Sequence, residues 1–388
     1  MSHVIIVGGG IIGVATAYFL GRSGHQVVLL EREKTLGELT TAASMQAVRA
    51  QFSDPANIAF MQESLSFYEQ FEERLDLPGH DIGFHQQGYL FVTSEETEVE
   101  LLRERVALQH RHGLTDVEFL AGRELRERFP YLAGEALAGT FRARDGWLSA
   151  HEALLGFRQA ARRYDVTFQL RTMVERVLRQ GDRIIGVATS AGNLHADHVV
   201  LTAGPFTAGL AQTADVTLPL DPMRRHRLVI GEHALIPGWA PMTIDHDTGA
   251  HWRPEGPGAA LAWAEPEEPS PPAMHISPDP AFPFRVLEGV YRLNPFWLDV
   301  AETLPRSQVF LDAGQYTVSP DHNPLIGPVP EVEGLWVSSG FSGHGVMATP
   351  AAARLLAELI DGAQSLSTNP FALDRPTLST GGGESMLI

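Results

Sequence analysis

The chain opens with residues 1–32, MSHVIIVGGGIIGVATAYFLGRSGHQVVLLER, and the spacing of the glycines in this stretch decides the fold. Residues 4–7 form a short β-branched run that is typical of a buried parallel strand. An apolar stripe at helical spacing follows over residues 14–20, and residues 24–31 are typical of a turn and a second strand. The stretch therefore predicts the order strand, glycine turn, helix, strand.

Gly8, Gly10 and Gly13 stand where a dinucleotide-binding turn needs glycine. The first permits the tight turn, the second lets a pyrophosphate approach the backbone, and the third lets the helix pack closely on the strand. The start of the helix, at Ile11 and Ile12, offers free N–H groups and the positive end of the helix dipole to the phosphates. We therefore expect these five residues to bind the cofactor.

Glu31 ends the second strand and is placed to accept hydrogen bonds from ribose hydroxyls, with Arg32 beside it. An acid at this position disfavours a 2′-phosphate, which favours FAD or NAD over NADP. A purely structural strand–helix–strand unit is the alternative interpretation, since glycines also mark ordinary turns. No Lys or Arg precedes the apolar residues and the glycines interrupt them, so we expect a cytoplasmic protein and not a secreted one.

The composition of the whole chain limits its partners. Its 388 residues are enough for two domains, and its formal net charge of −18 argues against nucleic acid and anionic membranes, which would repel it. The absence of cysteine excludes disulfides, thiolate metal sites and cysteinyl-linked cofactors. We expect no membrane span, because no apolar run is long enough, and no metal site, because the histidines form no pattern typical of one.

Periodicity outlines the rest of the chain. Helical spacing of apolar residues occurs in three segments: 58–77, 95–112 and 150–164. Residues 165–204 alternate and turn like a β-meander and end in an apolar strand, 198–201, followed by Ala203 and Gly204, small residues that let a ligand approach the backbone. The proline-rich segment 266–283 predicts a surface loop, and the polar C-terminal end predicts a mobile tail.

Taken together, these segments resemble the D-amino-acid-oxidase-like family of flavoproteins, in its sarcosine oxidase, dimethylglycine dehydrogenase and glycine oxidase branch. The resemblance extends in the right order over almost the whole chain. The matching stretches are the N-terminal fingerprint, SMQAVRAQF (44–52), DGWLSAHEALLGF (145–157), MVERVLRQGDRIIGV (173–187), VVLTAGP (199–205), TGAHWRPEG (248–256), YTVSPDHNPLIG (316–327) and GLWVSSGFSGHGVMATPAAARLLAELI (334–360).

The resemblance implies an α/β protein, α+β overall, in which a Rossmann-like FAD-binding domain carries an inserted antiparallel-sheet substrate domain. It also implies that the backbone of Val174 meets the adenine of FAD. The implied division is 1–80, 146–216 and 310–364 for the FAD-binding domain, 81–145 and 217–309 for the substrate domain, and 365–388 for the mobile tail.

The stretch GFSGHG, residues 340–345, precedes a segment of strong helix formers. Thr349 predicts an N-cap, Pro350 the first helical position and Gly362 the end of this helix. Its dipole would favour the negative charge that a flavin gains around N1 and the C2 carbonyl on taking up hydride. A plain connector is the alternative, but the resemblance implies that this loop binds flavin through Gly340, Phe341, Gly343, His344, Gly345 and Val346.

Four residues are candidates for the substrate site, and the resemblance supports two of them. Arg49 matches the arginine that binds the substrate carboxylate in the sarcosine oxidase branch, and a guanidinium suits a carboxylate bidentately. Tyr316 matches a tyrosine near the substrate, where it would donate a hydrogen bond or form the pocket wall. Arg253 reaches the same cavity or lies on a strand face, and His344 is a flavin contact, a proton donor or a structural loop residue.

Three places in the sequence depart from the family pattern. Gly314 stands where some sarcosine oxidases carry the cysteine linked to flavin, and Ser44 and Met45 stand where dimethylglycine dehydrogenases carry a histidine linked to flavin. Gly314 and Ser44 remain in the predicted cofactor site, and we expect noncovalent FAD. Met347 replaces a lysine that helps to hold the carboxylate in monomeric sarcosine oxidase, so a bulkier or less acidic amine than sarcosine becomes an open alternative.

The resemblance implies an FAD-dependent oxidoreductase that dehydrogenates the C–N bond of an amino acid or of an N-methylated or cyclic amine that is sarcosine-like, glycine-like or proline-like. Hydride would pass to flavin N5, and the imine would be hydrolysed by water. Oxygen, or an electron-acceptor protein or quinone, would accept the electrons. The alternatives are a flavoprotein that acts in assembly or electron transfer without amine turnover, and an NAD-dependent dehydrogenase, which the GFSGHG stretch disfavours.

Overall fold

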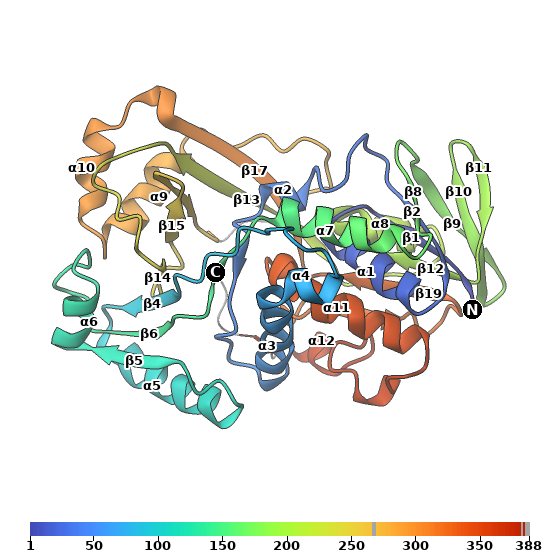
Figure 1. Cartoon of the computed structure of the whole chain (residues 1–388), viewed down its shortest axis with the longest axis horizontal. Coiled ribbons are helices and arrows are strands. Elements are labelled where there is room, and N and C mark those ends of the chain that lie inside the picture. Colours follow the sequence, from blue (N-terminus) through green and yellow to red (C-terminus); the bar gives the residue numbers. More distant parts are fainter. Residues whose placement is uncertain (266–268, 382, 385–388) are drawn as a thin grey trace.

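The structure is a computed structural model that describes residues 1–265, 269–381, 383 and 384. It has two main sheets at opposite ends of an elongated molecule, and two long paired strands of one sheet, β13 and β17, extend towards the other sheet (Figure 1). The six-stranded sheet has the order β18-β19-β12-β1-β2-β8. Its strands are β1 (His3–Val7), β2 (Gln26–Leu30), β8 (Thr167–Gln169), β12 (His198–Leu201), β18 (Leu325–Pro328) and β19 (Leu335–Ser339).

The first strand, helix and strand form the predicted parallel unit. β1 pairs in parallel with both β2 and β12, and α1 (Ile11–Arg22) connects β1 to β2. On one face of this sheet α1 packs between α7 (Ala150–Arg162) and α11 (Gly345–Ile360). The small antiparallel sheet of β9 (Val174–Gln180), β10 (Arg183–Thr189) and β11 (Gly192–His195) shares a second apolar core with the other face. These layers confirm the predicted Rossmann-like architecture.

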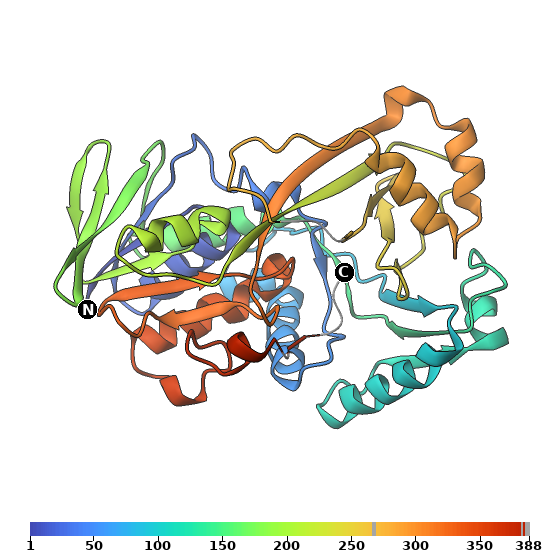
Figure 2. The same cartoon turned by 180° about the vertical axis from the view of Figure 1, so that it is seen from behind.

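The eight-stranded sheet has the order β17-β13-β16-β15-β14-β4-β6-β5, and all neighbours are antiparallel except β14 and β4. One of its faces is covered by helices, among them α9 (Phe282–Tyr291) and α10 (Phe296–Thr303) at one end, as both views show (Figure 2). Its strands are β4 (Tyr89–Thr93), β5 (Glu118–Ala121), β6 (Ala138–Arg142), β13 (Asp221–Ile230), β14 (Met242–Asp245), β15 (His251–Glu255), β16 (Gly258–Ala262) and β17 (Val309–Val318).

The remaining elements connect these layers. The helix predicted over 58–77 is two helices, because the backbone leaves the helical conformation at Gln70. The proline-rich segment has no helix or strand from 269 to α9, and residues 266–268 lie outside the described part. The further elements are α2 (Thr40–Ala43), β3 (Ala47–Val48), α3 (Pro55–Glu69), α4 (Phe71–Leu75), α5 (Glu96–Arg111), α6 (Gly122–Arg128), β7 (Gly146–Trp147), α8 (Thr207–Gln212) and α12 (Thr377–Thr380).

The start of α11 differs from the sequence prediction. The helix begins at Gly345 and contains Pro350, so Thr349 is not its N-cap. Because proline has no N–H, the carbonyl of Val346 lacks its usual helical hydrogen bond. The hydroxyl of Tyr68 on α3 donates to that carbonyl over 2.6 Å and replaces the missing bond. A distant side chain therefore allows the helix to start one turn earlier than its own sequence indicates.

The C-terminal segment also differs from the expected mobile tail. Phe371 is buried, and the guanidinium of Arg375 forms two 2.7 Å bonds to the buried carboxylate of Asp321. The carboxylate of Glu384 accepts hydrogen bonds from the backbone N–H groups of Ser53 and Asp54 at the start of α3. These contacts fix the described part of the segment, whereas residues 382 and 385–388 of the predicted tail lie outside the described residues. Within the described chain, no helix is both long and apolar enough to cross a bilayer.

Candidate active site

A cavity of about 470 Å³ lies between the two sheets. It extends from the glycine turn after β1, past the loop before α11, to the face of the eight-stranded sheet that the helices leave uncovered. Its walls therefore come from both predicted domains.

The glycine turn forms one end of the cavity. Gly8 has φ +113°, and a Cβ atom there would lie 2.6 Å from the carbonyl oxygen of Thr202 on the segment after β12. At Gly13 a Cβ atom would lie 2.1 Å from the carbonyl oxygen of Gly8, so only glycine allows α1 to pack this closely on the turn. Gly10 has no neighbour closer than 3.5 Å to such an atom, which leaves its backbone accessible from the cavity.

Glu31 lies beside this turn and organises it. One carboxylate oxygen accepts the N–H of Gly9 over 2.6 Å, and the other accepts the N–H of Glu33 over 2.8 Å. A carboxylate oxygen has lone pairs for more than one donor, so Glu31 can still accept a hydroxyl proton from a ribose. The guanidinium of Arg32 lies 3.6 Å from the centre of the Phe206 ring and closes the side of this end.

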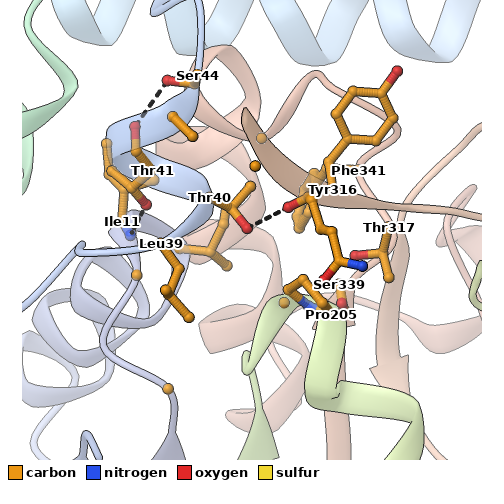
Figure 3. A pocket seen from close by; sticks show the side chains of 18 of the residues that line it. Ile11, Leu39, Thr40, Thr41, Ser44, Pro205, Tyr316, Thr317, Ser339 and Phe341 are labelled. Carbon is orange, nitrogen blue, oxygen red and sulfur yellow. Dashed lines mark hydrogen bonds between the residues drawn. The ribbon is translucent and has the colours of Figure 1, made fainter. Parts of the chain in front are cut away.

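Two threonines on α2 contact this end of the cavity, and the sequence analysis did not identify them. Thr41 Oγ1 accepts the N–H of Ile11, the first residue of α1, over 3.2 Å. Thr40 Oγ1 donates to the carbonyl of Gln315 on β17 over 2.6 Å, so α2 ties the glycine turn to the eight-stranded sheet (Figure 3). The signal in the sequence was weak, because a Thr-Thr pair before small residues is also common in loops.

The loop before α11 forms the middle of the cavity. Gly343 has φ +88°, and a Cβ atom there would lie 3.4 Å from the ring of Tyr316. The hydroxyls of Ser338 and Ser339, at the end of β19, line the cavity and are buried without a hydrogen-bond partner in the described part of the chain. Buried hydroxyls of this kind need an acceptor or donor from a ligand. A dinucleotide turn and a polar, glycine-lined slot in one cavity fit FAD.

The face of the eight-stranded sheet forms the other end. Residues that lie opposite one another on adjacent strands point to the same side of a sheet, and so do residues two positions apart on one strand. The row Arg227, Ala262, His251 and Ile244 crosses four adjacent strands. The residues of this face that line the cavity are Tyr89, Arg225, Arg227, Met242, His251, Ala262, Gly314 and Tyr316.

Two of these cavity residues are joined to each other. Arg225 Nε donates to the hydroxyl of Tyr316 over 2.6 Å, and its guanidinium lies 4.8 Å from the centre of the tyrosine ring. Arg225 was not among the predicted residues. The polar and apolar residues of β13 do not alternate clearly enough to reveal which face of the strand is buried. Only the pairing of β13 with β17 shows that Arg225 lies at the cavity.

Arg49 is not among the residues that line this cavity, although it lies close to it, and its predicted contact with a substrate carboxylate stays a prediction. Its side chain is completely buried, and its guanidinium lies 3.9 Å from the centre of the Phe52 ring. Nη2 is 3.5 Å from Nε2 of His344, which does line the cavity. Burial, followed by the positive charge of Arg49, lowers the pKa of His344 to about 3, so this imidazole is neutral at neutral pH.

Arg253 does not line the cavity either. Its Nε donates to the carbonyl of Met45 over 2.9 Å, and Arg227 Nη1 donates to the carbonyl of Ser44 over 2.7 Å. The two arginines therefore attach the segment before Arg49 to the sheet. Gly13 is also absent from the lining, because it packs against the turn. The predicted residues that line the cavity are Gly8, Gly10, Ile11, Ile12, Glu31, Arg32, Ser44, Val174, Ala203, Gly204, Gly314, Tyr316, Gly340, Phe341, Gly343, His344, Gly345 and Val346.

Comparison with known proteins now identifies the family. Residues 3–359 match the family model described as "FAD dependent oxidoreductase". This chain is a member of that family of FAD-dependent oxidoreductases. The chain is 30% identical over 96% of its length to "FAD-dependent oxidoreductase domain-containing protein 1" of Xenopus laevis, covering 82% of that protein. It is 26% identical over 94% of its length to glycine oxidase of Pseudomonas aeruginosa, covering 96% of that protein.

The solved structure of L-proline dehydrogenase from P. horikoshii is similar to this FAD-dependent oxidoreductase over its full length. The TM-score is 0.86 at 25% identity, and the match covers 98% of this chain and 99% of the other. The cofactor is thus FAD, and the protein is an enzyme that acts by oxidation and reduction.

Proposed function

We propose that this FAD-dependent oxidoreductase dehydrogenates the C–N bond of an amino acid or of an N-methylated or cyclic amine. The observation that carries the proposal is one continuous cavity, which has the glycine turn at one end and a sheet face with Arg225, Arg227 and Tyr316 at the other. The first end suits the dinucleotide of FAD, and the second suits a small acid, because guanidinium groups bind carboxylates well. Glycine oxidase and L-proline dehydrogenase, named above, act on substrates of this chemical class.

Bound FAD supplies the hydride acceptor. The chain's own residues orient the substrate and stabilise charge, which is most of what a flavoenzyme protein contributes. Arg225, held by Tyr316, orients the carboxylate, and Arg49 adds positive charge from behind His344. The start of α11 at Gly345 directs its free N–H groups towards the cavity and stabilises negative charge that develops there. The product is an imine, which water hydrolyses.

The cofactor is proposed to be bound without a covalent link. Gly314 has no side chain, and a Cβ atom there would lie 2.5 Å from Cβ of Ala43, so the position has no room for a linking group. Ser44 donates its hydroxyl to the carbonyl of Thr41 over 2.9 Å and remains a candidate contact only. The electron acceptor, either oxygen or an electron-acceptor protein or quinone, stays a prediction.

The test is anaerobic mixing of the purified, FAD-containing protein with a panel of amines: glycine, sarcosine, N,N-dimethylglycine, and both enantiomers of alanine and proline. We expect at least one of them to bleach the visible absorption of the flavin and to yield the corresponding carbonyl product. Peroxide formed on admission of air would indicate an oxidase, and its absence a dehydrogenase. If the flavin stays oxidised with every amine, the protein is instead a flavoprotein without amine turnover.

A further inference from the structure

One side chain of the cavity, His251 on β15, has a fixed orientation and an open nitrogen. It is only 5% exposed and lines the cavity. Its Nδ1 lies 2.8 Å from the carbonyl oxygen of Gly249, and because a carbonyl only accepts, Nδ1 carries the ring proton. Nε2 is then an acceptor, and it has no protein partner among the described residues. An acceptor without a protein partner at the wall of a cavity is free to accept a donor from the ligand.

The imidazole of His251 is neutral under ordinary conditions. Burial lowers its pKa to about 4, against the opposing effect of the Gly249 carbonyl, and the positive charge of Arg49 lowers it further. A neutral imidazole with Nδ1 engaged cannot donate at Nε2. The site at Nε2 is therefore specific for a ligand group that carries a hydrogen.

The surroundings of His251 favour an uncharged amine. Its in-register neighbours are Ile244 on one side and Ala262 on the other, so apolar side chains flank the imidazole. Beyond Ala262 lies Arg227, a cavity residue whose guanidinium is paired with the exposed carboxylate of Asp312, and the buried charge of Arg49 also acts on His251. Positive charge disfavours an ammonium group nearby and favours the amine form, whose nitrogen lone pair is needed for hydride loss.

We propose that His251 Nε2 accepts a hydrogen bond from the N–H of the bound amine, and that this protein therefore takes primary and secondary amines in preference to tertiary ones. A neutral tertiary amine has no N–H to donate, so its binding leaves Nε2 unpaired in the cavity. A site built around a hydrogen bond discriminates strongly against analogues that cannot make it. This inference rests on the proposed function and narrows its substrate class.

The experiment measures anaerobic flavin reduction with two matched pairs, sarcosine against N,N-dimethylglycine and proline against N-methylproline. The enzyme forms are the wild type, His251→Leu, which removes the acceptor, and His251→Gln, whose amide oxygen can replace it. Loss of one hydrogen bond is worth roughly a factor of ten. We expect His251→Leu to lose about tenfold in efficiency with the secondary amine, to change little with the tertiary one, and His251→Gln to recover most of the loss.

A separate binding measurement tests the same contact without turnover. Methoxyacetate, the unreactive ether analogue of sarcosine, lacks an N–H, so its dissociation constant, read from the perturbed flavin spectrum, should be nearly equal in the wild type and His251→Leu. His246→Gln is the control, because His246 is bonded to Glu98 and does not line the cavity. FAD content after gel filtration shows whether each variant is folded.

The outcomes separate the two proposals. Equal losses for secondary and tertiary amines in His251→Leu, or a wild type that prefers the tertiary member of both pairs, would overturn the role of His251 but leave the proposed function standing. A wild type that binds FAD but is reduced by no amine would overturn the proposed function itself.

Discussion

Glu31 links the glycine turn to the end of β2 through the N–H groups of Gly9 and Glu33. A glutamine has only one side-chain oxygen, so Glu31→Gln places an amide NH₂ against one of these donors and weakens any contact with a ribose hydroxyl. We expect this variant to lose FAD during dialysis, measured as the ratio of flavin to protein absorbance. Glu118→Gln, on the exposed surface of β5 in the eight-stranded sheet, is the matched control. Equal retention in both variants would remove Glu31 from the cofactor site.

The two cavity histidines make stability depend on pH. Folding lowers the pKa of His251 from 6.5 to about 4 and that of His344 from 6.5 to about 3, so the unfolded chain binds more protons below pH 6.5. Stability therefore rises with pH in this window. When the pH is lowered from about 7 to about 5, the protonation of each histidine in the unfolded chain should lower the free energy of unfolding by about 2 kcal/mol.

Urea unfolding at the two pH values measures this effect. His251→Gln should show a smaller loss on acidification than the wild type, by about 2 kcal/mol, because glutamine does not titrate. The same pH dependence in both proteins would mean that His251 is accessible to protons in the folded state.

At the scale of single residues, the sequence predicts the glycines of the site, which act through their backbone, better than the residues that act through their side chains. Gly8 and Gly343 are recognisable because a turn or a close approach requires glycine. Arg49 matches a family arginine, but its burial beside His344, 295 residues away in the sequence, depends on long-range packing. His251 and Arg225 were missed because the cavity face of a strand is defined only by pairing across the whole sheet.

At the scale of elements, α11 depends on α3. Tyr68→Phe removes the donor to the Val346 carbonyl, which Pro350 cannot replace, and leaves a buried acceptor unpaired. We expect a loss of about 1–2 kcal/mol in the free energy of unfolding. In a Pro350→Ala background the backbone N–H is restored, so the same change at Tyr68 should cost clearly less. Identical costs in both backgrounds, measured by urea unfolding, would show that the two groups do not act on one carbonyl.

The elements near the N-terminus were predicted well for a local reason. The strand, turn and helix signals of residues 1–32 are contained within the segment itself, so β1, α1 and β2 follow from it. The start of α11 was predicted wrongly because its compensating partner, Tyr68, lies 278 residues from Val346 in the sequence. Local sequence patterns cannot predict a hydrogen bond between residues so far apart in the chain.

At the scale of the molecule, the C-terminal segment fastens distant parts of the chain. Arg375 is bound to the buried carboxylate of Asp321, which burial alone would make harder to ionise but whose hydrogen bonds from Arg375 and Thr377 lower its pKa to about 2. Arg375→Met leaves that charge buried without its ion-pair partner. We expect a loss of about 3 kcal/mol in the free energy of unfolding.

Asp321→Asn in the same background removes the charge and should restore part of this stability. Chemical unfolding of the three proteins provides the comparison. If Arg375→Met is as stable as the wild type, the segment is not held by this ion pair, and the tail would be mobile, as its composition predicts.

The central claim is that one cavity holds FAD with its adenine near Val174 and its ring between the 340–345 loop and the cavity face of the eight-stranded sheet. The crystal structure of the FAD-bound protein tests it most directly. The account predicts electron density for the isoalloxazine ring beside Gly343 and His344, with His251 and Arg225 across the remaining space. Density for the ring outside that slot, or a cofactor bound in the reverse direction, would contradict it.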